Sequence, residues 1–581
     1  MACSTSPGQE KASIIGVIPR YPRHTQHNIY GRVRMPPVGI VSVLSQLARD
    51  TRLRLYAIDE NNYGGPTDFT GMPDHDFLQQ RQPSKIAMFY GGMSNSIPRM
   101  FSIAKKYKKF GAVTIAGGSH VDALPEEALH SGIDIIVHNE GEETVKKLAN
   151  IILDDVGNVA EDYRDRLREV RGISFLHRGK HVFTGPCAPI KDLDSIEDTD
   201  LTLIRFLQKK WTAIPINKGR GCNFRCEFCV VNKQYGAYKA CSIEKTMRQV
   251  TKYSDMGYTA FFFTDDYFAQ NAAETIELCK RIGDYKRTFR KKIDLIVQVR
   301  SEVADNDELI QAMKYAGVTT MAIGYESPID EELKAMKKGV TVKLLIERSR
   351  KLAESFYLHG MFIFGYPKPM GIESAAMTLR QRAKEYARFF RKAKLDTVQV
   401  VNAVPLPGSE LRARLEKEGR VFPKEMTGWD KYDGLFLCYD PTPEGLDPYE
   451  LQNLPKILMK KRYMGNFLNS TLNYGHWIEW AYSFSIGFPI NFSAFYARRF
   501  ARNILEKGRK NKFELELSSG KDLFYHPLLN TWGDMKRRMR NLVVKTYAGT
   551  LIRDWTKEYK KSNYSLRLNE FFMKRHEKPI E

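Results

Sequence analysis

The sequence predicts an α/β protein in which two successive α/β units are followed by a mostly helical C-terminal region. The chain has 581 residues, which is more than one hydrophobic core usually supports. Short apolar runs ending in Gly, Asp or Asn alternate with helical patterns over the first 150 residues, and a second alternation begins near residue 206. Alternating strands and helices are typical of parallel sheets, so both units are expected to contain one.

The N-terminal third contains five predicted strands separated by helical patterns. Residues 37–50 and 97–111 carry apolar side chains at helical spacing. This alternation predicts a doubly wound, Rossmann-like sheet, whose ligands bind beyond the carboxyl ends of its strands. The predicted strands cover residues 13–19, 53–59, 85–92, 112–118 and 133–141.

The segments at these strand ends carry recognisable motifs, namely "MPPVGIVSVLSQL", "GGMSNSIPR", "AGGSHVDALPEEAL" and "NEGEET". With them, residues 10–150 resemble the cobalamin-binding domain that precedes many radical S-adenosylmethionine (SAM) enzymes. In that family these loops cradle the corrin ring and its nucleotide tail. The resemblance implies corrin contacts from Ser94, Asn95, Gly117, Gly118, Glu140, Gly141 and Glu142.

One motif of this domain departs from the cobalamin-binding pattern. Domains that bind cobalt through a histidine carry D-x-H-x-x-G, whereas residues 59–64 read "DENNYG". Asp59 and Gly64 match, but Asn61 replaces the histidine, and an amide is a poor cobalt ligand. The resemblance therefore implies that cobalt has water or no ligand on its lower face. The alternative is a domain that keeps the fold without the cofactor.

Residues 219–231, "GRGCNFRCEFCVV", place Cys222, Cys226 and Cys229 at C-x3-C-x2-C spacing. A structural zinc site would show a second ligand pair, but the next cysteine, Cys241, stands alone. Three cysteines on one short loop suit a four-iron cluster in which thiolates bind three irons and the fourth iron stays open. The spacing thus predicts a 4Fe-4S cluster with one open coordination position.

The loop, with Phe228 directly before its last cysteine, resembles the signature C-x3-C-x-aromatic-C of the radical SAM superfamily. In that family the open iron binds SAM, and an electron passed through the cluster cleaves SAM to methionine and a 5'-deoxyadenosyl radical. The resemblance places Phe228 near the adenine. It also implies a partial (β/α)6 barrel, whose predicted strands lie within residues 212–219, 258–268, 293–302, 319–327, 359–367 and 396–411.

Polar residues at the ends of these strands are the predicted SAM contacts. In the family the second strand presents polar groups to the SAM amino group, the third points side chains inward, and the Glu of a G-x-E-S segment binds the ribose. The amphipathic helices between the strands are expected to end at Gly257 and Gly317. The matching residues are Asp265, Asp266, Gln298, Arg300, Glu326 and Ser327.

Four regions follow from this reading: residues 1–155 form the N-terminal unit, 156–205 a linker, 206–425 the barrel, and 426–581 a substrate-capping region. The last region resembles the segment that follows the barrel in enzymes acting on hopanoids and bacteriochlorophyll-type tetrapyrroles.

Residues 494–581 carry 21 Lys+Arg against 10 Asp+Glu, a net charge of +11 and so half of the net charge of +22 of the whole chain. Together with the aromatic residues just before them, they suit an anionic membrane surface, while a core helix with a solvated basic tail is the alternative. Nucleic acid is disfavoured because no recognition module is present.

The two implied cofactors suggest methylation of an unactivated carbon. The radical would remove hydrogen, methylcobalamin would supply the methyl group, and a second SAM would remethylate cobalt; no catalytic histidine is needed. A hydrophobic tetrapyrrole or isoprenoid lipid is the expected substrate, and flavodoxin or ferredoxin the expected electron donor. The N-terminus shows no signal peptide and the eight cysteines form no disulfide framework, which predicts a cytoplasmic protein, on the inner face of the membrane if the basic tail binds there.

Three other readings remain open. The same parts would serve a cyclase that forms a ring on a tetrapyrrole or lipid without methyl transfer. A tRNA-modifying methylthiotransferase-like protein would carry three further cysteines upstream, but Cys3 and Cys187 alone precede the loop. A metal-binding scaffold would bind iron without cleaving SAM.

Overall fold

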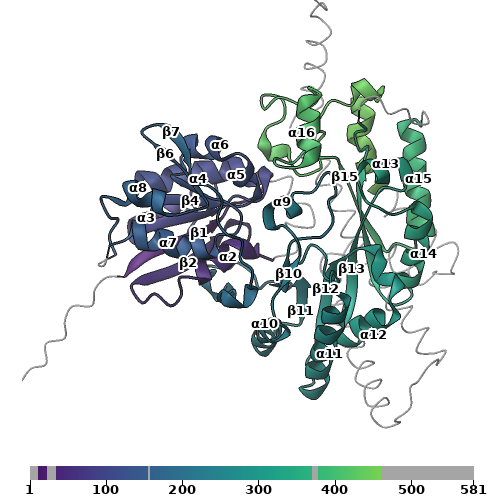
Figure 1. Cartoon of the computed structure of the whole chain (residues 1–581), viewed down its shortest axis with the longest axis horizontal. Coiled ribbons are helices and arrows are strands. Elements are labelled where there is room, and N and C mark those ends of the chain that lie inside the picture. Colours follow the sequence, from purple (N-terminus) through teal and green to yellow (C-terminus); the bar gives the residue numbers. More distant parts are fainter. Residues whose placement is uncertain (1–10, 23–34, 155–156, 370–376, 460–581) are drawn as a thin grey trace, which may run out of the picture.

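The computed structural model describes residues 11–22, 35–154, 157–369 and 377–459 (Figure 1). Its N-terminal unit is built on a seven-stranded sheet with the order β2-β1-β3-β4-β5-β6-β7. The first five strands run parallel, as predicted, and chain order reverses between β1 and β3, where doubly wound sheets bind ligands. The strands are β1 (Ala12–Ile18), β2 (Leu53–Asp59), β3 (Ser84–Tyr90), β4 (Val113–Gly117), β5 (Ile135–Val137), β6 (Ile173–His177) and β7 (Lys180–Phe183).

The helices of this unit pack around the sheet. The longest, α4, has Pro98 in its first turn, where the missing N–H costs nothing, and lysines in its last turn, where they favour the helix dipole. Their bounds are α2 (Val38–Ser45), α3 (His75–Arg81), α4 (Ile97–Lys109), α5 (Ser119–Ala123), α6 (Pro125–His130), α7 (Glu142–Ile152) and α8 (Tyr163–Arg166).

The predicted linker, residues 156–205, contains structure that the sequence reading did not anticipate. Strands β6 and β7 form an antiparallel hairpin that extends the N-terminal sheet from β5. The two residues between them, Arg178 and Gly179, have φ values of 50° and 78°. Two positive φ values are the mark of a tight type I′ turn, which matches the twist of the strands it joins. The N-terminal sheet therefore reaches well into this segment.

The second unit is a six-stranded, all-parallel sheet with the order β15-β14-β13-β12-β11-β8. This is the predicted partial (β/α)6 barrel, and α11, α12, α14 and α15 lie along its outer side (Figure 1). The strands are β8 (Ile214–Ile216), β11 (Ala260–Phe263), β12 (Asp294–Val299), β13 (Val318–Glu326), β14 (Tyr357–Phe364) and β15 (Thr397–Asn402). The helices are α9 (Val231–Tyr235), α10 (Ile243–Asp255), α11 (Ala272–Thr288), α12 (Asp307–Ala316), α13 (Asp330–Ala335), α14 (Val342–Ala353), α15 (Leu379–Lys392) and α16 (Glu410–Lys417).

The helix ends follow the expected chemistry. Asn306 caps α12 by accepting a hydrogen bond from the Leu309 N–H, and Gly317 ends it in the left-handed conformation with φ of 96°. Gly257, the predicted end of the preceding helix, also has a positive φ, 83°, just after α10. The sequence pattern therefore located both helix ends.

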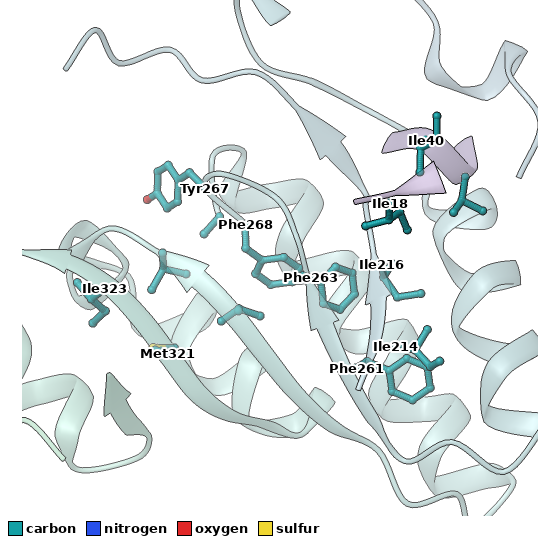
Figure 2. Close-up of a cluster of buried hydrophobic side chains, with 14 of the residues drawn as sticks. Ile18, Ile40, Ile214, Ile216, Phe261, Phe263, Tyr267, Phe268, Met321 and Ile323 are labelled. Atoms are coloured by element: carbon teal, nitrogen blue, oxygen red, sulfur yellow. The ribbon is translucent and has the colours of Figure 1, made fainter. Parts of the chain in front are cut away.

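The two units share one hydrophobic core. A single cluster of buried side chains includes residues of β1, α2, β8 and β11. Figure 2 shows Ile18 and Ile40 of the N-terminal unit beside Ile214 and Ile216 of β8. Burial of this shared apolar surface holds the two units against each other.

Residues 426–459 return to the N-terminal unit. The short helix η8 (Trp429–Lys431) contributes Trp429 to a second hydrophobic cluster, which otherwise consists mainly of N-terminal residues. Within the described part of the chain, no helix is both long and apolar enough to cross a membrane. The predicted aromatic and basic segments of the C-terminal region, residues 477–581, lie outside the described residues.

Candidate active site at the cysteine loop

The cysteine loop, residues 221–238, lies between β8 and α10. A two-stranded hairpin closes its base, with β9 (Gly219–Arg220) paired to β10 (Lys239–Ala240). Cys222, Cys226 and Cys229 are half-exposed and free of disulfide bonds. The turn before Cys222 needs glycine, since Gly221 has φ of +82° and an added Cβ would lie 2.5 Å from the Ala237 carbonyl oxygen.

The three cysteines do not converge on one point. Among the described residues, no three Cys, His, Asp or Glu side chains lie close enough together to hold a single metal ion. The thiolates of a four-iron cluster bind three different irons, so they surround a larger centre than one ion. Three free, half-exposed thiols on one loop therefore fit a cluster better than a zinc ion.

Aromatic side chains of this loop contact the barrel. The Arg300 guanidinium lies 3.7 Å from the ring centre of Phe224, a cation–π contact between β12 and the loop. Phe228, the predicted neighbour of the adenine, is half-buried and meets Tyr366 edge to face at 6.4 Å between ring centres. These contacts hold the loop over the carboxyl ends of the strands.

Asp265 and Asp266 follow β11, as predicted. Asp265 is buried; its Oδ2 accepts a hydrogen bond from the Lys218 backbone N–H at 3.2 Å. Its Oδ1 is also buried and finds no hydrogen-bond donor among the described residues. Burial raises the pKa of Asp265 to about 7. An unpartnered buried acceptor at a strand end is suited to a donor group on a ligand, whereas the Asp266 side chain is exposed.

Gln298 and Arg300 lie at the end of β12. The Gln298 side-chain amide donates to the Asp265 carbonyl oxygen at 3.3 Å, so it braces the neighbouring strand end. Arg300 donates to the Glu302 carboxylate at 2.8 Å and to the Lys338 carbonyl oxygen at 2.9 Å. Both residues lie where the sequence predicted them, and both position other groups.

Glu326 ends β13 in a strained backbone conformation. Its φ of 63° lies in the left-handed region, and the pairing with β14 shifts register beside it. Its carboxylate accepts a hydrogen bond from the buried Lys338 ammonium at 2.9 Å. Strain of this kind persists where the surrounding structure enforces it and is typical of functional sites. Ser327, by contrast, is fully buried and donates to Glu332, so its hydroxyl is already committed inside the fold.

The predicted corrin contacts after β3 and β4 lie together at the carboxyl edge of the N-terminal sheet. An added Cβ on Gly118 would lie 2.4 Å from the Gly92 backbone nitrogen, so glycine allows these two loops to touch. Ser94 and Asn95 are buried in the first loop, and Gly117 ends β4. The Ser94 hydroxyl lies 2.9 Å from His120 Nδ1, while the buried His120 Nε2 has no partner among the described residues. This glycine-rich edge with an unsatisfied polar atom fits a bound polar cofactor.

Asp59, Asn61 and Gly64, the predicted contacts from "DENNYG", make contacts within the protein. The Asn61 amide donates to the Asp59 carboxylate at 3.0 Å and accepts from the Tyr21 backbone N–H at 3.0 Å. An added Cβ on Gly64 would lie 2.8 Å from the Gln208 Cα. Asn61 braces the chain after β1, and Gly64 packs against Gln208 at the start of the region 206–425, next to the edge strand β2.

The Glu140 and Glu142 side chains also bind another part of the protein. Gly141, between them, is the N-cap residue of α7. Both carboxylates are buried and form ion pairs with Arg220 at the base of the cysteine loop. Both carboxylates therefore join the N-terminal unit to the cysteine loop, and their contact with a corrin stays a prediction.

Comparison with known proteins agrees with this geometry. The profile of the family described as Radical SAM superfamily matches residues 216–370, which include the cysteine loop and strands β11 to β14. Residues 216–370 thus form a radical SAM domain.

Three curated relatives are similar to this chain over long segments. An uncharacterized methyltransferase of Pyrococcus horikoshii is 26% identical over 445 residues, 74% of this chain and 88% of that protein. The anaerobic magnesium-protoporphyrin IX monomethyl ester cyclase of Cereibacter sphaeroides is 28% identical over 265 residues, 44% of this chain and 42% of the cyclase. The hopanoid C-2 methylase of Rhodopseudomonas palustris is 22% identical over 425 residues, 71% and 72% of the two chains.

Two solved structures share the fold of this chain. The cobalamin-dependent SAM radical enzyme OxsB, with aqua-cobalamin and SAM bound, has a TM-score of 0.58 and 14% identity, covering 99% of this chain and 82% of OxsB. The radical SAM methyltransferase TsrM from Kitasatospora setae, with a tryptophan substrate and a SAM analogue, has a TM-score of 0.58 and 13% identity, covering 76% and 89%. The order of an N-terminal doubly wound unit and a partial barrel is therefore the fold of cobalamin-dependent radical SAM enzymes.

Two buried charged residues beside the cysteine loop were not found from the sequence. Lys218, two residues after β8, is buried and donates from its Nζ to Glu274 at 2.7 Å. Glu227 lies between two of the cysteines and accepts hydrogen bonds from Arg414 and Tyr366. The sequence shows only that a lysine and a glutamate stand next to the cysteines. The partner of Lys218 is Glu274, 56 residues away, and the partner of Glu227 is Arg414, 187 residues away.

Proposed function

We propose that this chain is a cobalamin-dependent radical SAM C-methyltransferase that acts on an unactivated carbon of a hydrophobic tetrapyrrole or isoprenoid lipid. The observation that carries the proposal is the position of the cysteine loop. The loop covers the carboxyl ends of the barrel strands, while its base forms ion pairs with the N-terminal unit. One loop thus stands between the two units that would hold the two cofactors.

The cysteine thiolates would hold the cluster, and the strand ends would orient SAM. When bound, the cluster and SAM supply a 5'-deoxyadenosyl radical, and cobalamin supplies a methyl group. Asp265 offers a buried acceptor for an ammonium or hydroxyl donor, and Glu326 offers a carboxylate held by Lys338. The tasks of this chain are to position these groups and to exclude water from reactive species.

The residues of the N-terminal unit would hold cobalamin at the edge formed by the loops after β3 and β4. His120 is neutral near pH 7, because burial lowers its pKa to about 4, and its free Nε2 can make a hydrogen bond there. Asn61 is bound within the protein and offers cobalt no ligand. The radical methylation of carbon needs no general base, so no histidine is assigned a catalytic role.

The proposed substrate class rests on the relatives. Proteins similar to this chain are named for a hopanoid and for a magnesium protoporphyrin ester, both large and hydrophobic. A large apolar ligand is bound mainly by burial of its surface, with a few polar groups fixing its orientation. We further propose an external electron donor such as flavodoxin or ferredoxin. Peripheral membrane contact stays a prediction from the sequence, since its residues lie outside the described part.

Oxidative ring formation is the second candidate function. It is favoured by the cyclase relative, which is 28% identical over its matched segment, more than the hopanoid methylase at 22%. The methylase, however, matches 71% of this chain and the cyclase 44%. Product mass separates the two outcomes, because each methylation adds one methylene equivalent and hydrogen-removing ring formation subtracts mass.

The deciding experiment is anaerobic reconstitution with iron, sulfide and hydroxocobalamin, followed by spectra of the desalted protein. Deoxyadenosine is then measured after reduction in the presence of SAM. One retained corrin per chain, together with cluster-dependent deoxyadenosine, supports the proposal. Deoxyadenosine formation without retained corrin contradicts the cobalamin part and favours radical chemistry without methyl transfer.

A further inference from the structure

The base of the cysteine loop carries two cations side by side. Arg220 on β9 and Lys239 on β10 are direct cross-strand partners in the antiparallel hairpin. Arg220 lies two residues before Cys222, and the hairpin encloses the segment that contains all three cysteines. Any movement of these two side chains is therefore transmitted to the cysteines through a few bonds of backbone.

Two carboxylates of the N-terminal unit face these cations. Arg220 Nη1 lies 3.2 Å from Glu140 Oε1, and Arg220 Nη2 pairs with Glu142 Oε1. Lys239 Nζ pairs with Glu140 Oε2 and donates to the Ile190 carbonyl oxygen at 2.6 Å. The Ser42 hydroxyl donates to Glu142 at 2.8 Å. We call Arg220, Lys239, Glu140 and Glu142 the ionic quartet.

In the ionic quartet the two carboxylates are buried, the two cations are partly buried, and the charges balance. The exposed fractions of its four side chains are 13%, 16%, 4% and 3%, so water screens the charges poorly. Two cations face two anions. Burial by itself would raise the pKa of Glu142, but the Arg220 guanidinium and the Ser42 hydroxyl outweigh it and lower that pKa. Removing one cation therefore leaves an unbalanced charge in the interior.

We infer that the ionic quartet is a positioning device, and that Arg220 is the positioning residue that sets the cysteine loop relative to the N-terminal unit. The inference rests on the proposed function, in which the substrate carbon must lie between groups held by the two units. Apolar contacts also join the units, but they are not directional. A guanidinium that binds two carboxylates fixes both distance and orientation, which suits a reaction sensitive to small misplacements.

This role predicts a particular division of effects. The cluster ligands and the SAM contacts all lie in the barrel unit, so SAM cleavage does not depend on the alignment of the two units. In the Arg220→Met variant, methylated product per deoxyadenosine is expected to fall by about 10- to 100-fold, a larger change than the fall in deoxyadenosine formation itself. A merely structural role would lower both quantities together.

The first measurement needs neither cofactor nor substrate. Hydrogen exchange of residues 221–238 is compared in the wild type, Arg220→Met, Arg220→Lys and the rebalanced double variant Arg220→Met/Glu142→Gln. Arg220→Met is expected to exchange at least about tenfold faster in this loop, with β12 to β14 unchanged. Arg220→Lys keeps the positive charge but loses the guanidinium that binds two carboxylates at once, so its loop should exchange at an intermediate rate. The double variant restores the charge balance, so it stays folded even if the unbalanced charge unfolds Arg220→Met. Arg248→Met, which removes the exposed pair with Asp198, is the matched control.

The second measurement uses the reconstituted holoprotein. Magnetic coupling between the reduced cluster and cob(II)alamin is recorded by electron paramagnetic resonance, because it depends on the distance between the two centres. Altered coupling with each separate signal intact supports the inference. Unchanged loop exchange in a folded Arg220→Met or double variant overturns it. If the chain retains no cobalamin, the proposed function fails, but loop exchange still decides whether Arg220 positions the loop.

Discussion

The two units use the polar residues at their strand ends in different ways. In the barrel, Asp265 keeps a buried oxygen without a donor among the described residues, and Glu326 is held by Lys338 of the same unit. In the N-terminal unit, the acidic residues beyond β4 and β5 bind other parts of the chain. Glu140 and Glu142 hold the base of the cysteine loop, and Glu127 accepts a hydrogen bond from Trp429 at 2.9 Å.

This difference separates two kinds of motif residue. Asp265 keeps an open acceptor in the barrel, whereas Gln298, Arg300 and Ser327 are engaged within it. Glu140 and Glu142 of the N-terminal unit join the two units, although they stand in loops that resemble a cofactor site. A buried polar atom without a partner is therefore the more specific mark of a ligand contact.

Substitution of a cysteine in the loop gives the largest expected effect. Cys226→Ala removes one thiolate from the cluster, so deoxyadenosine formation should fall by about 10³-fold or more, equivalent to about 4 kcal/mol. Iron content and the deoxyadenosine assay measure it. Cys241→Ala is the matched control, since this half-buried cysteine lies outside the motif. Equal losses of iron and of deoxyadenosine formation in both variants would contradict cluster binding by the motif cysteines.

Removal of Arg414 tests the other anchor of the loop. Arg414 Nε lies 2.7 Å from Glu227 Oε1, and Tyr366 donates to the same carboxylate. Arg414→Met leaves the buried Glu227 charge without its cation, which should cost about 3–5 kcal/mol of stability. The thermal unfolding midpoint should fall accordingly. Lys280→Met, which breaks an exposed pair with Glu308, should cost less than about 1 kcal/mol. Similar shifts in the two variants would contradict a buried anchor.

The raised pKa of Asp265 predicts a pH dependence of stability. The folded pKa of about 7 lies above the unfolded value, so the folded state binds the extra proton between these values. Stability from this group is full below about pH 4 and is lost as pH rises toward 7, by about 2–4 kcal/mol. Asp265→Asn should remove this loss, so its unfolding midpoint should gain on the wild type between pH 5 and pH 8. The exposed control Asp162→Asn should show no such gain.

The sequence predicted most of the strands because each is a continuous apolar run. The run 53–59 coincides with β2, and 112–118 contains β4. The hairpin β6–β7 was missed, although the dipeptide Arg178–Gly179 carries a turn signal, because its flanking strands are short and half polar.

The cysteine loop was predictable because its chemistry is local, with three thiols within eight residues. The partners of the N-terminal acids were not. Glu142 and Arg220 are 78 residues apart in the sequence and belong to different units. Their pairing depends on how the two units pack against each other. That packing cannot be predicted from the periodicity or residue spacing of a single segment. Resemblance to a cofactor loop therefore gave no sign of the ion pairs that Glu140 and Glu142 form with Arg220.

The smallest expected effect concerns Trp429, which joins the C-terminal segment to the N-terminal unit. Trp429→Phe keeps an aromatic ring against His120 but removes the indole N–H that Glu127 accepts. Lys424 still reaches the same Glu127 oxygen at 2.9 Å, so the cost should be only about 1 kcal/mol. Trp429→Ala also opens a cavity and should cost about 3–5 kcal/mol. The difference between the two thermal midpoints separates packing from hydrogen bonding. If Phe proved as harmful as Ala, the ion pair and hydrogen bond at Glu127 would hold the two segments together and the ring packing would matter little.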